Sequence, residues 1–116
     1  MGDRVLIQVK AGTEFSPVCY LHWSGDSAPA LIRETAELMK GRDNDVAYCF
    51  ARLVGVCHTS TPGNLSLGVW NADALLTSEE SHGDAGIYIV DCGTWDVVAM
   101  GGYGTSFNAR APEAAA

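Results

Sequence analysis

Short runs of apolar and β-branched residues predict five strands in this chain. In order, they cover residues 5–9, 18–23, 65–70, 87–91 and 95–100. One turn separates the first two runs, and residues 92–94 separate the last two, so each pair is expected to form a hairpin. Gly68 interrupts the third run.

Between the second and third strands, apolar residues recur at helical spacing and predict two helices. The first helix is expected to run to about Lys40, where Gly41 ends it as a left-handed cap. The second is expected over residues 46–58, with Asn44 or Asp45 as its capping residue. Apolar side chains form a stripe along this second helix, which indicates that one of its faces is buried.

These elements give the order ββααβββ and predict an α+β fold. Strands joined by short turns favour an antiparallel sheet of about five strands, with both helices packed on one face. We expect a single domain over residues 1–110 and a loose C-terminal tail over residues 111–116. A polar connection at 71–85 is long enough to carry function and is expected to hold one helical turn at 73–76.

The charge of the chain limits its partners. Fourteen acidic and seven basic residues among 116 give a net charge of −7, which disfavours bulk nucleic-acid binding. One or two arginines still suffice to hold a small anion. The sequence has only two lysines, a residue that is depleted at protein interfaces, so a homo-oligomer is expected. Neither a secretory signal nor a membrane span is expected, which predicts a cytoplasmic protein.

The glycine-rich segment after the last strand is a candidate anion site. Glycines such as Gly102 let backbone N–H groups approach a phosphate, and Tyr103 offers a ring for stacking on a base. Arg110, with Asn108 beside it, follows a few residues later and is suited to pair with a phosphate. The alternative is a flexible exit from the edge of the sheet. The segment lacks the Lys-Ser/Thr ending of a phosphate-binding P-loop.

Further candidates lie near the strand ends. His22 and Trp23 come where a strand meets a helix start, a place where free N–H groups attract anions. Their alternative role is half-buried packing. Asn71 is a polar position beside the third strand, and His82 and Asp84 lie in the long connection, where the alternative is a local turn.

The cysteines do not predict a metal site. Cys19 and His22 are three residues apart on a strand and therefore point to opposite faces. Cys49 and Cys57 fall on the apolar stripe of the second helix, where a free cysteine behaves as a small hydrophobe. Cys92 is expected to be the most exposed, at a hairpin turn. No metal and no cofactor are therefore expected.

Three stretches resemble small proteins encoded in phages and prophages, in which a Tyr-x-His-Trp-x-Gly strand leads into a helix. They are CYLHWSGDSAPAL, RLVGVC and GNLSLGVWN, and the resemblance spans about residues 18–104. Size, element order and acidic balance are also similar to the phage Thoeris anti-defence proteins, which sequester cyclic ADP-ribose-type signals without cleaving them. This second resemblance implies a homo-oligomer with ligand pockets at subunit boundaries. Arg110, Asn108, Arg52 and Tyr103 are available to line such pockets.

Three functional hypotheses follow. The favoured one is a phage counter-defence protein, acting in the host cytoplasm, that binds a small anionic, cyclic nucleotide-type immune signal and does not cleave it. The second is a protein–protein inhibitor of a host defence complex that acts through an acidic surface. The third is a small hydrolase that uses His82 and Asp84, or Cys92.

Overall fold

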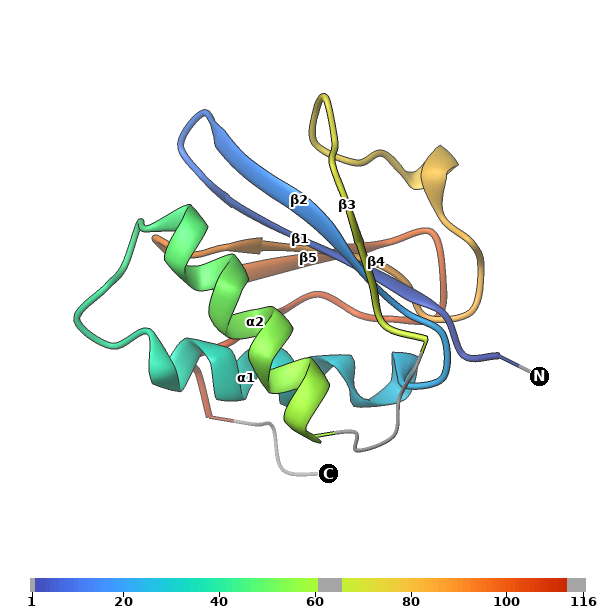
Figure 1. The fold of residues 1–116 in the computed structure, drawn as a ribbon, viewed down its shortest axis with the longest axis horizontal. Helices are drawn as coiled ribbons and strands as arrows, with labels where there is room; N and C mark the ends of the chain where they lie inside the picture. The colour runs from blue at the N-terminus through green and yellow to red at the C-terminus, as the bar shows by residue number, and fades with distance from the viewer. Residues whose placement is uncertain (1, 61–65, 113–116) are drawn as a thin grey trace.

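The computed structural model describes residues 2–60 and 66–112 and shows an α+β fold, as predicted (Figure 1). In chain order its elements are β1 (Val5–Ala11), β2 (Glu14–Leu21), η1 (Gly25–Ser27), α1 (Ala28–Leu38), α2 (Val46–Ser60), β3 (Gly68–Trp70), η2 (Ser78–Glu80), β4 (Gly86–Asp91), β5 (Asp96–Met100) and β6 (Phe107–Asn108).

The strands form one sheet in the order β3-β2-β1-β4-β5-β6. Both predicted hairpins are present, as the antiparallel pairs β1–β2 and β4–β5. The prediction of an antiparallel sheet was wrong in one respect, because the central pair β1–β4 is parallel and the sheet is therefore mixed. The described residues also include a sixth strand, β6, which pairs with β5 and was not predicted.

The parallel pair follows from the length of chain between its strands. A parallel neighbour needs a long crossover, and both helices and β3 lie between β2 and β4. Lys10 of β1 and Asp91 of β4 are neighbours in this register and form an ion pair of 3.2 Å. The two hairpins are therefore held together by the strand pairing of β1 with β4 and by this ion pair.

Both helices cover the same face of the sheet, as predicted (Figure 1). Helix α1 ends at Leu38, two residues before the predicted end, and Gly41 beyond it has a φ of 86°. Asp45 caps α2, because its carboxylate accepts the N–H of Tyr48 at 3.1 Å. The helix-side core contains most of the buried apolar residues of β1, β2 and both helices.

The opposite face of the sheet carries a second, smaller apolar cluster: Leu6, Val18, Ile87 and Ile89. Partly buried residues of the connection after β3, Ala72 and Leu76, pack against it. Val5 to Val9 are consequently all buried, although they alternate between the two faces of the sheet. The face away from the helices is therefore covered by an irregular segment rather than open to solvent.

Several local predictions differ from the structure. β2 begins at Glu14 and ends at Leu21, whereas the strand was expected at 18–23. The helical turn expected at 73–76 is absent, and the turn in this connection is instead the 3₁₀ helix η2 at Ser78–Glu80. The strand expected at 65–70 begins at Gly68, and Leu65 lies outside the described residues, as do 113–116 of the predicted tail. In the described part of the chain, no helix has the length and apolar character to cross a bilayer.

Candidate functional site

A cavity of about 480 Å³ lies on the face of the sheet opposite the helices, between the strands β1–β3 and the connection after β3. Its size is within the range of small-molecule sites. The lining combines apolar, aromatic and acidic side chains: Leu6, Val18, Trp70, Asn71, Ala72, Asp73, Ala74, Leu76, Glu80 and His82.

Gln8 holds the wall of this cavity in place. Its side chain is fully buried, and its amide nitrogen donates to the carbonyls of Ser16, at 2.9 Å, and Ala74, at 3.3 Å. Its amide oxygen accepts the N–H of Leu76 at 2.9 Å. The connection after β3 is therefore tied to the central strand of the sheet through one side chain.

The 3₁₀ helix η2 orients the acidic end of the cavity. The carboxylate of Glu80 accepts the backbone N–H of Thr77 at 2.8 Å, as part of a capping box. This bond uses one carboxylate oxygen and fixes the side chain of Glu80. Asp73, the second acidic residue of the lining, lies in the preceding irregular stretch and is exposed.

Aromatic rings gather at one side of the cavity. Trp70 of β3 is opposite Val18 in the sheet, so Tyr20 lies on the same face of β2. The ring centroids of Tyr20 and Trp70 are 5.6 Å apart, and those of Trp70 and His82 are 6.2 Å apart at an interplanar angle of 22°. Trp70 remains 42% exposed, which leaves part of its indole available to a ligand.

His22 and Trp23 extend this aromatic group beyond the cavity lining. The hydroxyl of Tyr20 is 2.5 Å from Nδ1 of His22, and the His22 and Trp23 rings are 4.5 Å apart. Tyr20 also contacts His82 at a centroid distance of 5.5 Å. Of the predicted site residues, Asn71 thus lines the cavity, His22 contacts Tyr20 beside it, and Trp23 packs against His22.

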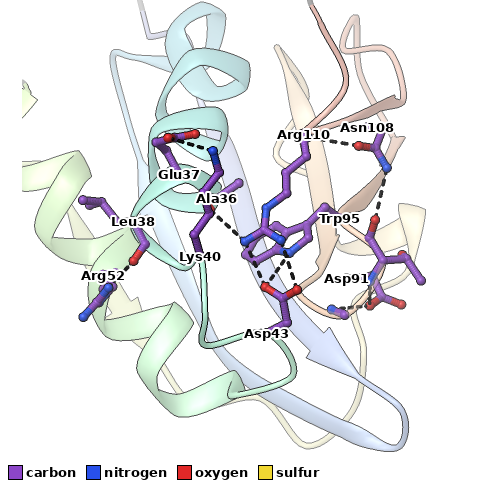
Figure 2. Close-up of polar contacts among 12 residues, drawn as sticks. Ala36, Glu37, Leu38, Lys40, Asp43, Arg52, Asp91, Trp95, Asn108 and Arg110 are labelled. Carbon is purple, nitrogen blue, oxygen red and sulfur yellow. Dashed lines mark hydrogen bonds and ion pairs between the residues drawn. The ribbon is translucent and has the colours of Figure 1, made fainter.

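Arg110 and Asn108 are placed elsewhere, in a structural network (Figure 2). The guanidinium of Arg110 pairs with both carboxylate oxygens of Asp43, at 3.0 and 2.9 Å, and donates to the carbonyl of Ala36 at 3.1 Å. It also lies over the ring of Trp95 at 4.7 Å. Asn108 accepts the backbone N–H of Arg110. These contacts join the C-terminal segment to the loop between the helices.

Asp43 is the counter-charge of this network. The hydrogen bond from Arg110 lowers the pKa of its carboxyl, and a further bond from the indole N–H of Trp95, at 3.2 Å, acts in the same direction. Arg110 is therefore occupied within its own chain, which reduces its capacity to bind a phosphate.

Gly102 and Tyr103 lie at the other end of β5 from Asn108 and Arg110. Asn108 pairs with Asp96 at the start of this strand, whereas the backbone N–H of Tyr103 donates to the carbonyl of Asp84 at 2.9 Å. A Cβ on Gly102 would lie 2.3 Å from that same carbonyl oxygen, so close backbone packing requires glycine there. The structure does not bring Tyr103 and Arg110 into one anion cavity.

Tyr103 makes a local contact of its own. Its hydroxyl donates to the carboxylate of Asp3 at 2.7 Å. Burial of the hydroxyl, and then this hydrogen bond, raise the pKa of Tyr103. Arg52 lies on α2, on the helix side of the sheet, where its guanidinium donates to the carbonyl of Leu38 and lies 4.2 Å from the centre of the Tyr48 ring.

The two residues proposed for hydrolysis in the long connection have different surroundings. Asp84 accepts both the backbone N–H and Nε of Arg4, each at 3.0 Å, and the backbone bond from Arg4, followed by the side-chain bond, lowers its pKa. His82 faces the cavity instead.

The prediction that Cys92 is exposed was wrong, because it is fully buried. Asp91 accepts the N–H groups of residues 93 and 94, which forms the turn and leaves the thiol inside.

The cavity itself was not predicted from sequence, because its walls come from segments far apart in the chain. One signal was available: Val18 and Tyr20 alternate along β2 and share a face with Trp70. Among the described residues, no group of three or more His, Cys, Asp or Glu side chains is placed to hold a metal ion.

No protein-family model, curated protein or solved structure was found to match this chain.

Proposed function

We propose that this chain is a small-molecule binding protein whose cavity accepts a flat heteroaromatic group of the nucleobase type. The observation that carries the proposal is the cavity of about 480 Å³ in which the exposed indole of Trp70 lies beside His82. Any nucleobase can stack on such a ring, regardless of its substituents, because every base has a π-face. The apolar floor, with Leu6 and Val18, suits the same flat group.

The polar groups of the lining favour a ligand that donates hydrogen bonds. Asp73 and Glu80 supply carboxylate oxygens, and Asn71 supplies an amide. Amino groups and ring N–H groups of a base are suitable partners for these acceptors. Within the described part of the chain, the lining contains no lysine or arginine, so the base rather than a phosphate is the group that this cavity recognises.

Sequestration of a cyclic nucleotide-type signal by a phage counter-defence protein is compatible with this arrangement. The phosphates of such a ligand would lie outside the lining, which contains no lysine or arginine among the described residues. Arg4 lies against Gly83, 3.9 Å from the position of a Cβ there, and is held by its ion pair with Asp84. Binding without cleavage is favoured because Asp84 is engaged by Arg4 and the thiol of Cys92 is buried.

Calorimetric titration of the purified chain with adenosine, AMP and cyclic ADP-ribose tests the proposal. At least one of these ligands is expected to bind one per cavity and to be recovered unchanged after the protein is denatured. Trp70→Ala is expected to weaken binding about tenfold, because base–aromatic stacking contributes about 1–3 kcal/mol. Chromatography of the released ligand distinguishes binding from hydrolysis.

Trp23→Ala is the matched control, since Trp23 is 54% exposed and outside the cavity lining. It is expected to leave the affinity nearly unchanged. Equal losses in the two variants would place the ligand elsewhere. If none of the three ligands binds, or if a cleaved product is recovered, the proposed function is incorrect.

A further inference from the structure

The cavity opposite the helices carries negative charge that the chain itself does not balance. Asp73 and Glu80 belong to its lining, which holds no lysine or arginine among the described residues. Neither carboxylate forms an ion pair with a described lysine, arginine or histidine. Asp84 differs from them, because Arg4 engages its carboxylate at 3.0 Å. The charge of the cavity wall is therefore available to a ligand.

Glu80 is held in position before any ligand arrives. Its Oε2 accepts the backbone N–H of Thr77 at 2.8 Å, within the capping box of η2. Its other oxygen, Oε1, has no hydrogen-bond partner in the described part of the chain. A side chain that is already ordered loses little conformational entropy when a ligand binds, so Glu80 is suited to act as a fixed counter-charge.

Aromatic rings lie in the same wall as the carboxylates. Trp70 and His82 belong to the lining, and Tyr20 contacts both, at centroid distances of 5.6 and 5.5 Å. The face of an aromatic ring attracts a cation, and tryptophan does so most strongly. Trp70 is partly exposed, and the apolar side chains of Leu6 and Val18 line the cavity with it. Rings and carboxylates together favour a ligand that is both flat and positively charged.

We propose that the cavity selects a heteroaromatic ring that carries a positive charge, such as an N-alkylated nucleobase, over a neutral ring of the same size. This selection rests on the proposed function, because the same cavity binds the base, and it adds the charge of that base. The ring stacks on the indole of Trp70, where cation–π attraction adds to stacking, and Asp73 and Glu80 balance its charge. The net charge of −7 also raises the local concentration of a cationic ligand.

Two methylated adenosines separate the effect of charge from that of shape. At pH 7, 1-methyladenosine is a cation, whereas N6-methyladenosine is neutral and carries its methyl group on the adjacent exocyclic nitrogen. Calorimetric titration of the purified chain is expected to give an affinity about tenfold higher for 1-methyladenosine, because a cation–π contact is added to stacking. The preference is expected to decrease as salt is added, since the carboxylates are exposed.

Glu80→Gln and Asp73→Asn remove the two negative charges and keep the shape of each side chain. The amide oxygen in Glu80→Gln can still accept the N–H of Thr77, because a capping box accommodates either glutamate or glutamine. The double variant is expected to lose most of the tenfold preference and to keep its affinity for N6-methyladenosine. Circular dichroism checks that the fold is retained.

Glu79→Gln is the matched control. Glu79 is also exposed and precedes Glu80 on η2, but it lies outside the cavity lining. The substitution changes the net charge of the chain by the same amount as Glu80→Gln, and it is expected to leave the preference unchanged. An equal loss of preference in these two single variants would show that the cavity carboxylates are not its source, and would overturn the proposal.

Equal affinities of the wild-type chain for the two isomers, or tighter binding of the neutral one, would also overturn the proposal. The proposed function would stand in that case, provided that adenosine, AMP or cyclic ADP-ribose binds. If 1-methyladenosine binds and none of those three ligands does, selection of a charged ring holds and the proposed function requires correction. Binding of neither isomer would overturn the charge selection, and the titration with adenosine then decides the proposed function separately.

Discussion

At the scale of single residues, Gln8 is the side chain on which the cavity depends. In the sequence it is an isolated polar residue within a β-branched run, which would ordinarily indicate a solvent-facing position. The structure buries it and gives its amide three backbone partners. A buried amide persists in a core when its hydrogen bonds are satisfied, and here they also place the connection after β3.

Gln8→Met, which keeps the length of the side chain, is expected to lower the free energy of unfolding by about 1–3 kcal/mol, because buried backbone groups lose their partners. It is also expected to weaken ligand binding, since the carbonyl of Ala74 and the N–H of Leu76 are released from the sheet. Urea unfolding and calorimetric titration measure the two effects.

Ser16→Ala is the control for Gln8→Met. The hydroxyl of Ser16 accepts the N–H of Val9 at 2.9 Å, at the irregularity in the β1–β2 pairing, so its loss also reduces stability. It leaves the bonds between Gln8 and the connection in place. If both variants weaken binding equally, the cavity does not depend on the tie through Gln8.

At the scale of elements, sequence periodicity predicted both helices and both hairpins because each is set by neighbouring residues. Asp45 caps α2 through local hydrogen bonds, and the β4–β5 turn is closed by Asp91. The sequence did not predict β6, because two residues carry too little periodicity to indicate a strand. The parallel β1–β4 pair and the cavity were missed because they depend on contacts between distant segments.

Gly86 at the start of β4 is an element-scale feature open to test. Its φ is 90°, and a Cβ there would lie 2.4 Å from the carbonyl oxygen of Met100, which belongs to the neighbouring strand β5. Gly86→Ala is expected to cost more than about 1 kcal/mol, because strain in φ adds to the clash. Thermal unfolding followed by circular dichroism measures the change.

Gly55→Ala provides the opposite case for the same substitution. Gly55 lies within α2, and nothing is within 4 Å of a Cβ placed on it. We expect a gain of about 0.5–1 kcal/mol, because alanine has the higher helix propensity. A neutral or stabilising Gly86→Ala would show that the start of β4 adjusts to a side chain.

At the scale of the whole molecule, three carboxylates join distant segments and have lowered pKa values. Asp43 is held by Arg110 and Asp84 by Arg4. For Asp91, burial raises the pKa, but the N–H groups of residues 93 and 94 and the ammonium of Lys10 outweigh it. Arg110, predicted to bind a phosphate, is likewise engaged by a carboxylate, because a guanidinium in an acidic chain finds such partners within its own fold.

Stability is therefore expected to fall in acid, and the Arg110–Asp43 pair allows one part of that fall to be isolated. The pKa of Asp43 is lower in the folded chain than its unfolded value of about 3.9, so the unfolded state binds more protons as the pH falls. The ion pair stabilises the fold fully above the pKa that Asp43 has in the unfolded chain. This stabilisation is lost as the pH falls through the pKa of Asp43 in the folded chain. Arg110→Ala is expected to lower the free energy of unfolding by about 1 kcal/mol at pH 7, by loss of the ion pair and the contact with Trp95.

Urea unfolding of wild type and Arg110→Ala across the acid range measures this contribution, and the difference between them is expected to shrink as Asp43 becomes protonated. Arg52→Ala is the control, because Arg52 donates to the carbonyl of Leu38, which does not titrate, and its effect should be the same at every pH. A difference for Arg110→Ala that stays constant down to strong acid would mean that the pair with Asp43 does not stabilise the fold.

Ligand affinity at pH 7 should be unchanged in both variants, because both arginines lie outside the cavity wall. A large loss of affinity in Arg110→Ala would instead favour the anion site that the sequence alone suggested.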